Sequence, residues 1–171
     1  MRKSILSLLI LFSFFKTSFG QELVMITDTI NKFQIGVPVG WRYFGPQVNS
    51  VAFQANRQKV DENDKPRENY NINIMHHKET DLNEEYKNFI SAISKREGFR
   101  IIDQKDKIIN GRKYKYLIET HKNIKSQEDM TDCIIFTNNN GEILQLTMAT
   151  ISENFDKYSL LFDRIAESLK Y

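Results

Sequence analysis

The three histidines are the residues whose side chains are best suited to bind a metal ion. His76 and His77 are adjacent in a segment of alternating polar and apolar residues, and His121 lies further along the chain. Adjacent strand residues point to opposite faces, so both cannot hold one ion. A site would need further ligands, from His121 or from the acids of 79–85. We therefore expect no metal and no other cofactor, and we keep His76 and His121 as candidate binding residues.

Three aromatic residues close together form the second candidate for recognition. Trp41, Tyr43 and Phe44 follow Pro38 and Gly40, in what the sequence indicates to be a loop. Aromatic side chains often anchor interfaces. The alternative is that such a residue closes one end of the core. We expect that role for Trp41, whereas Tyr43 and Phe44 remain candidate binding residues.

The other reactive residue types do not form a catalytic pattern. No Gly-x-Ser-x-Gly elbow occurs, and Gly36, Gly40 and Gly45 do not have the spacing of a phosphate-binding loop. Cys133 is the only cysteine, which excludes an intrachain disulfide. It begins the apolar run Cys133–Phe136, which predicts a buried, unreactive thiol. The sequence therefore predicts no catalytic residue and favours a protein that is not an enzyme.

The first twenty residues have the pattern of a cleavable export signal. Two basic residues precede the apolar run Ile5–Phe15, and the small residues Ser18 and Gly20 stand before Gln21. A helix of eleven residues is roughly 17 Å long, which is too short to cross the ~30 Å hydrocarbon core of a membrane. We expect residues 1–20 to be a signal peptide and the protein to be secreted or periplasmic.

The rest of the chain, 21–171, is expected to be one domain. Three basic residues and no acidic ones fall in the leader, so 21 basic and 22 acidic residues remain. They are mixed along the chain and form no basic stripe, which argues against nucleic acid as a partner. No further segment predicts a membrane span.

Apolar periodicity predicts two helices and seven strands. Asp81 with Glu84 resembles a capping box that opens a helix ending near Gly98, and Ser152 is expected to cap the last helix. Asn110-Gly111 predicts a tight hairpin turn. The expected strands are 33–37, 51–55, 70–76, 99–109, 112–121, 132–137 and 142–150.

The hairpins require antiparallel pairing, and each amphipathic helix must bury one face against the sheet. Apolar residues on both faces of 132–137 and 142–150 indicate central strands that are covered on both sides. The fold class is therefore α+β, an antiparallel α-β-α sandwich of three strands, a helix, four strands and a helix.

The elements carry a resemblance to a known family. The opening Phe33–Trp41 resembles the strand and Pro-x-Gly-Trp entry of the PsbP-like superfamily, and 108–118 resembles its central hairpin. The last helix is similar to that of the family at Tyr158, Phe162, Ile165, Ser168 and Leu169. The resemblance implies a six- to seven-stranded antiparallel sheet between helices and an accessory role in binding or assembly. It implies no particular ligand and no functional residue.

The leading hypothesis is an exported, non-enzymatic accessory protein that binds a protein partner or assists assembly at the cell envelope. The alternative is a protein that binds a small ligand or a metal, or an enzyme, with a pocket between sheet and helix. A third possibility is a structural component of the envelope without a discrete ligand.

Overall fold

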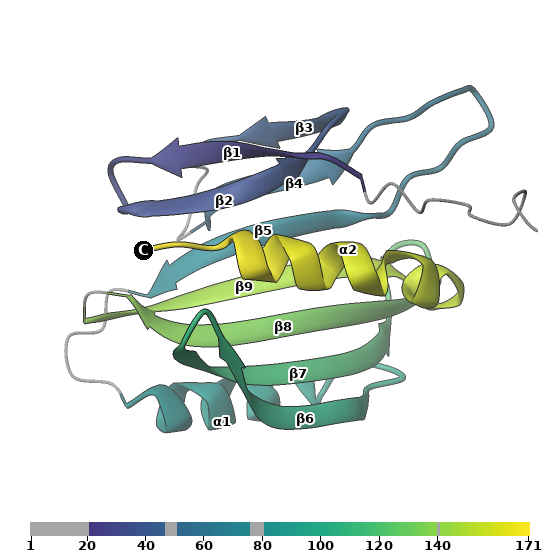
Figure 1. Cartoon of the computed structure of the whole chain (residues 1–171). Coiled ribbons are helices and arrows are strands. Elements are labelled where there is room, and N and C mark those ends of the chain that lie inside the picture. The colour runs from purple at the N-terminus through teal and green to yellow at the C-terminus, as the bar shows by residue number, and fades with distance from the viewer. Residues whose placement is uncertain (1–20, 47–50, 76–80, 140) are drawn as a thin grey trace, which may run out of the picture.

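The computed structural model describes residues 21–46, 51–75, 81–139 and 141–171, and the expected signal peptide lies outside them. Nine strands and two α-helices occur in this part of the chain (Figure 1). In chain order they are β1 (Leu23–Asp28), β2 (Phe33–Pro38), β3 (Trp41–Phe44), β4 (Val51–Arg57), β5 (Asn69–Met75), α1 (Leu82–Ile93), β6 (Arg100–Ile109), β7 (Arg112–Lys122), β8 (Asp129–Asn139), β9 (Glu142–Ile151) and α2 (Phe155–Ser168).

Seven of the strands form one antiparallel sheet in the order β3-β4-β5-β9-β8-β7-β6, and β1 pairs with β2 in a separate hairpin. The hairpin and α2 lie on the same face of the large sheet (Figure 1). Helix α1 packs on the opposite face. The predicted antiparallel sandwich is confirmed. None of the described helices is long and apolar enough to cross a membrane.

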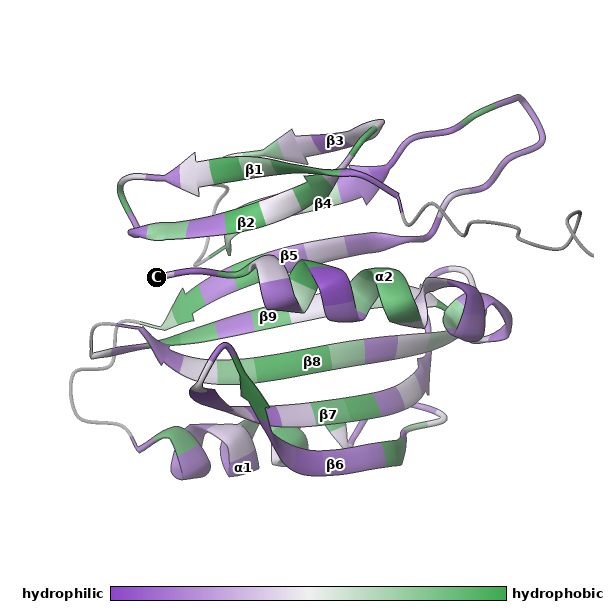
Figure 2. Cartoon of the chain, viewed as in Figure 1, coloured by the Kyte–Doolittle hydropathy of each residue, from purple (hydrophilic) through white to green (hydrophobic). Residues whose placement is uncertain are grey.

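The two faces of the sheet differ because strand side chains alternate. On β5, Tyr70, Ile72 and Ile74 are buried toward α2, whereas the residues between them are only half-buried. Strand β8 is buried on both faces, as the sequence predicts for a central strand. Figure 2 shows this difference as a hydrophobic band along β8 and mixed colours along β5.

The smaller core lies between α1 and the sheet. Tyr86 and Ile93 of α1 pack there with Phe136 of β8. The Asp81 carboxylate accepts hydrogen bonds from two backbone N–H groups of the first turn, so the predicted cap is confirmed. The helix ends at Ile93, however, and Gly98, with a φ of 70°, belongs to the turn that follows.

Ser152 does not cap α2. It lies in a short 3₁₀ turn before the helix, and its hydroxyl oxygen accepts a hydrogen bond from Thr131 at 2.9 Å. The prediction was wrong because Thr131, near the start of β8, provides a competing partner. The residue at the cap position, Asn154, makes no side-chain capping bond.

Two strands are absent from the sequence prediction. Strand β1 alternates poorly because it is a half-exposed edge, and β3 has only four residues. Trp41, Tyr43 and Phe44 therefore lie on a strand paired with β4, and not in a loop. Trp41 is buried at one end of the core, as expected.

A polar clamp joins the β1–β2 hairpin to the end of α2. The Ser168 hydroxyl accepts a hydrogen bond from the Gly36 N–H at 2.7 Å and donates one to the carbonyl of Ile165 at 2.6 Å. The Tyr70 hydroxyl donates to the Gly36 carbonyl at 3.0 Å. A Cβ at position 36 would meet the Ser168 hydroxyl and the Leu23 side chain at 2.9 Å. The close approach of helix and strand therefore requires glycine.

Ser168→Ala should lower the free energy of unfolding by about 1–3 kcal/mol, because the N–H of the buried Gly36 loses its acceptor. Ser159→Ala is the matched control, since the hydrogen bond that the half-buried Ser159 hydroxyl donates runs to the carbonyl of Asp156 in its own helix. That variant should stay within about 0.5 kcal/mol of the wild type. Urea unfolding of the three proteins measures both values, and equal losses would show that the clamp does not stabilise the fold.

Candidate binding site on the open sheet face

Strands β4, β5 and β9 carry neutral polar side chains on the face opposite α2. Pleat alternation and strand pairing place them together. We call them the amide array: Gln54, Asn56, Asn69, Asn71, Asn73, Gln145 and Thr147. Within the described residues of these three strands, no charged side chain shares this face. Gln145 is buried and the others are half-buried.

The strand register orders the array into rows. Asn71 lies between Gln54 and Thr147, and Asn73 lies opposite Gln145. The hydrogen bonds run along the strands: the Asn73 amide donates to Asn71 at 3.2 Å, and the Gln145 amide donates to Thr147 at 2.9 Å. Each bond uses one donor of an amide that carries two. The side chains are therefore held in place by groups of their own strand.

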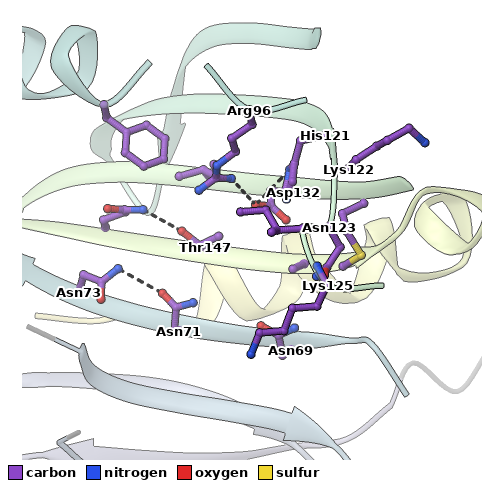
Figure 3. Close-up of a pocket in the computed structure, with 16 residues that line it drawn as sticks. Asn69, Asn71, Asn73, Arg96, His121, Lys122, Asn123, Lys125, Asp132 and Thr147 are labelled. Carbon is purple, nitrogen blue, oxygen red and sulfur yellow. Dashed lines mark hydrogen bonds and ion pairs between the residues drawn. The ribbon is translucent and has the colours of Figure 1, made fainter. Parts of the chain in front are cut away.

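A hollow of about 640 Å³ lies over part of the array (Figure 3). Phe89 of α1 and Arg96, which follows that helix, line one side, and the turn after β7 lines another. The full lining is Asn69, Asn71, Asn73, Phe89, Arg96, His121, Lys122, Asn123, Ile124, Lys125, Met130, Asp132, Ile134, Gln145, Thr147 and Ala149.

Beside the array lies a group of four charged residues, which we call the ion cluster: Arg96, Glu119, His121 and Asp132. Glu119 and Asp132 lie opposite each other on β7 and β8. The His121 Nδ1 is 3.1 Å from a carboxylate oxygen of Glu119. The Arg96 guanidinium is 3.4 Å from that oxygen and 3.7 Å from the Asp132 carboxylate. The arginine therefore bridges the two carboxylates, as Figure 3 shows for Arg96 and Asp132.

Burial controls the protonation of the ion cluster. Removal from water, together with the neighbouring Glu119, raises the pKa of Asp132 to about 6, although His121 and Arg96 oppose the rise. The hydrogen bond to Glu119 raises the pKa of His121 against the opposing effect of burial. The folded protein therefore holds protons here more tightly than the unfolded chain does.

Three members of the ion cluster have the chemistry of metal ligands. Glu119, His121 and Asp132 each offer one ligand atom, and these atoms lie within 4.8 Å of one another. Nitrogen and carboxylate oxygen suit zinc and similar ions. Arg96 already compensates both carboxylates, however, so an ion would have to displace its guanidinium. The acids that meet His121 come from β7 and β8, whereas the sequence analysis sought them in 79–85.

Two of the four sequence-predicted binding residues lie on the open face. His121 lines the hollow. Phe44 lies opposite Gln54 at the far margin of the array, with the Arg42 guanidinium 4.8 Å from its ring centre. Tyr43 points to the other face, where it stacks on Phe53 at 5.8 Å and is 48% exposed. His76 lies outside the described residues.

Sequence reasoning missed the amide array and three members of the ion cluster, Arg96, Glu119 and Asp132. A signal was available, because asparagine occurs at every second residue of β5 between buried apolar residues. Only the pairing of β5 with β4 and β9 brings Gln54 and Thr147 beside those asparagines. Likewise, Glu119 meets Asp132 only through the pairing of β7 with β8.

The ion cluster predicts that stability falls as pH rises. A raised pKa of His121 stabilises the fold fully below pH 6.5, and this contribution is lost as pH rises through the folded value. The raised pKa of Asp132 gives the same sign between its ordinary value of 3.8 and about 6. The free energy of unfolding should therefore decrease from about pH 5 until the pH has passed the folded pKa of His121.

His121→Gln should flatten the part of this decrease above pH 6.5, and Asp132→Asn the part below about pH 6. Urea unfolding at several pH values gives the slopes. If the wild type and His121→Gln had the same slope above pH 6.5, His121 would not be the titrating group.

Comparison with solved structures identifies the fold. No family model matches the chain, and no curated protein does. Among solved structures, the chain is similar to the PsbP protein CyanoP of Synechocystis, at a TM-score of 0.64 and 18% identity, over 88% of this chain and 92% of that one.

It is also similar to LpqN of Mycobacterium tuberculosis, a protein involved in cell envelope biogenesis (TM-score 0.62, 13% identity, 88% of this chain and 91% of that one). A third similar structure is Mog1p of Saccharomyces cerevisiae, a Ran-binding protein (TM-score 0.60, 7% identity, 88% and 95%). Each likeness extends over nearly all the described residues. The chain therefore has the PsbP-like fold that Phe33–Trp41, the central hairpin and the last helix indicate.

Proposed function

We propose that the chain is an exported accessory protein that binds a partner at the cell envelope without transforming it chemically. The observation that carries this proposal is the open polar face of the sheet, with its pre-ordered amide array and a hollow of about 640 Å³. A protein is the partner that the sequence analysis favours. The Ran-binding role of Mog1p and the envelope role of LpqN support a binding or assembly function.

The chemistry of the described reactive groups supports binding over catalysis. Burial raises the pKa of the Cys133 thiol to about 12, which keeps it protonated. His121 is engaged with Glu119, and Asp132 is almost fully buried beside them. In the described ranges, none of the groups that line the hollow combines a nucleophile with an adjacent free base.

Photo-crosslinking in native cells tests which face binds. A photoreactive amino acid replaces Asn71 in the array or, as the matched control, Leu160, which is 62% exposed on α2. The substitution at 71 should give a discrete crosslinked species in the envelope fraction, and the one at 160 should give little. Mass spectrometry of the product identifies a protein partner.

Two outcomes would count against this proposal. Equal crosslinking at both positions would show that the open face is not the binding surface. Recovery of the protein from the cytoplasm with residues 1–20 still attached would show that the protein is not exported.

A second candidate function is metal binding, which the spacing of Glu119, His121 and Asp132 favours. A ligand that binds only the folded protein stabilises it. On this candidate, Zn²⁺ at a concentration 100 times its Kd should stabilise the protein by about 2.7 kcal/mol. Thermal unfolding with and without Zn²⁺ measures the effect. The gain should disappear in His121→Gln, and a gain that persists there would place the ion elsewhere.

A further inference from the structure

We infer that the amide array is a carbohydrate-binding surface whose ligand is an uncharged saccharide chain. This inference rests on the proposed function, because it assigns a ligand class to the same open face. It also replaces the protein partner that the sequence analysis favours.

The first step of the argument is the chemistry of the array. All seven side chains are neutral amides or hydroxyls, and an amide can donate and accept hydrogen bonds at once. A sugar hydroxyl also donates and accepts. Ligands with fixed charge are recognised better by Arg, Lys or carboxylate groups. The surface therefore matches a ligand that has many hydroxyls and no net charge.

The second step is geometry. On one face of a strand, alternate residues are roughly 7 Å apart, and neighbouring strands lie about 4.8 Å apart. The array is thus a lattice of polar groups over β4, β5 and β9. The spacing of these groups is comparable to the spacing of the hydroxyls around a sugar ring. Bonds along the strands, such as that from Gln54 to Asn56 at 3.1 Å, hold the amides before any ligand arrives. Such preorganisation lowers the entropic cost of binding.

The third step concerns the margins. Phe44 lies beside Gln54 at one margin, and Phe89 lines the hollow on the side of α1. Both rings are half-buried, and Phe89 packs edge-on against Phe136 at 5.0 Å between ring centres. Aromatic rings are apolar surfaces of defined orientation, which suit the C–H face of a sugar. The amides can therefore form hydrogen bonds with the hydroxyls of a sugar, and the aromatic rings at the margins can pack against its C–H groups.

The fourth step excludes an anion as the main ligand. Of the arginine and lysine residues that line the hollow, two are compensated: Arg96 by Glu119 and Asp132, and Lys122 by Asp129 at 2.9 Å. Lys125, in the turn after β7, is the third. A protein ligand fits less well too, because the centre of a protein interface is mainly apolar, with aromatic anchors. Here the centre consists of amides and the aromatic rings are at the rim.

The test uses the mature protein with soluble neutral oligosaccharides, namely maltohexaose, cellohexaose and chitohexaose, and with polygalacturonate as an anionic probe. Nuclear magnetic resonance follows the side-chain NH₂ signals of the asparagines and glutamines, and calorimetry gives the Kd. We expect at least one neutral chain to bind, to shift the signals of Asn71 and Asn73, and to bind more tightly than polygalacturonate.

The double variant Asn71→Ala/Thr147→Val removes two neighbouring hydrogen-bonding groups and should weaken binding by roughly tenfold. Asn63→Ala, in the exposed loop after β4, is the matched control and should leave the Kd unchanged. If the double variant did not fold, the NH₂ shifts of the wild type would still decide the question.

The inference is overturned if no neutral saccharide binds, if binding leaves the array signals unchanged, or if polygalacturonate binds more tightly. A protein crosslinked at position 71 together with a negative saccharide result would overturn this inference and keep the proposed function. Failure of both experiments would overturn both.

Discussion

The two-residue period of the β-strand is the constraint on which the rest of this structure depends. On β5 and β9 it sends large apolar side chains to one face and amides to the other. The apolar face then requires a cover, which α2 and the β1–β2 hairpin provide together. Helix α1 buries only the second apolar cluster, around β7, β8 and the start of β9. The polar half of that face has no cover among the described elements, and the candidate site follows directly from this division.

The same division explains where the buried charge lies. The ion cluster is located at the boundary between the apolar cluster under α1 and the polar face. Its carboxylates are therefore removed from water, but polar groups as well as apolar side chains surround them. Burial of two acids side by side is costly unless cations meet them. Arg96 and His121 do so from the turn after α1 and from β7. The cluster thereby joins the end of the helix to the sheet.

The local sequence pattern was sufficient to predict the central part of the fold. The alternation in Phe33–Pro38 and the Asn110-Gly111 turn, with φ values of 52° and 78°, agree with the structure. Short or exposed elements, β1 and β3, lack enough alternation to be recognised. The candidate site depends on pairings between distant strands, such as Asn71 with Thr147, and register of that kind is not encoded in any one segment. His121 could be named from its chemistry, but its partners could not.

The single cysteine has a practical consequence. Cys133 lies in β8, between β7 and β9, where its thiol is 2% exposed and burial raises its pKa to about 12. Its side chain belongs to the core that α2 covers, so a thiol reagent in solution can reach it only after this core opens. The rate of alkylation of the unmodified protein therefore reports the frequency with which the core between the sheet and α2 opens. The chain carries its own probe of native-state opening, without an engineered label.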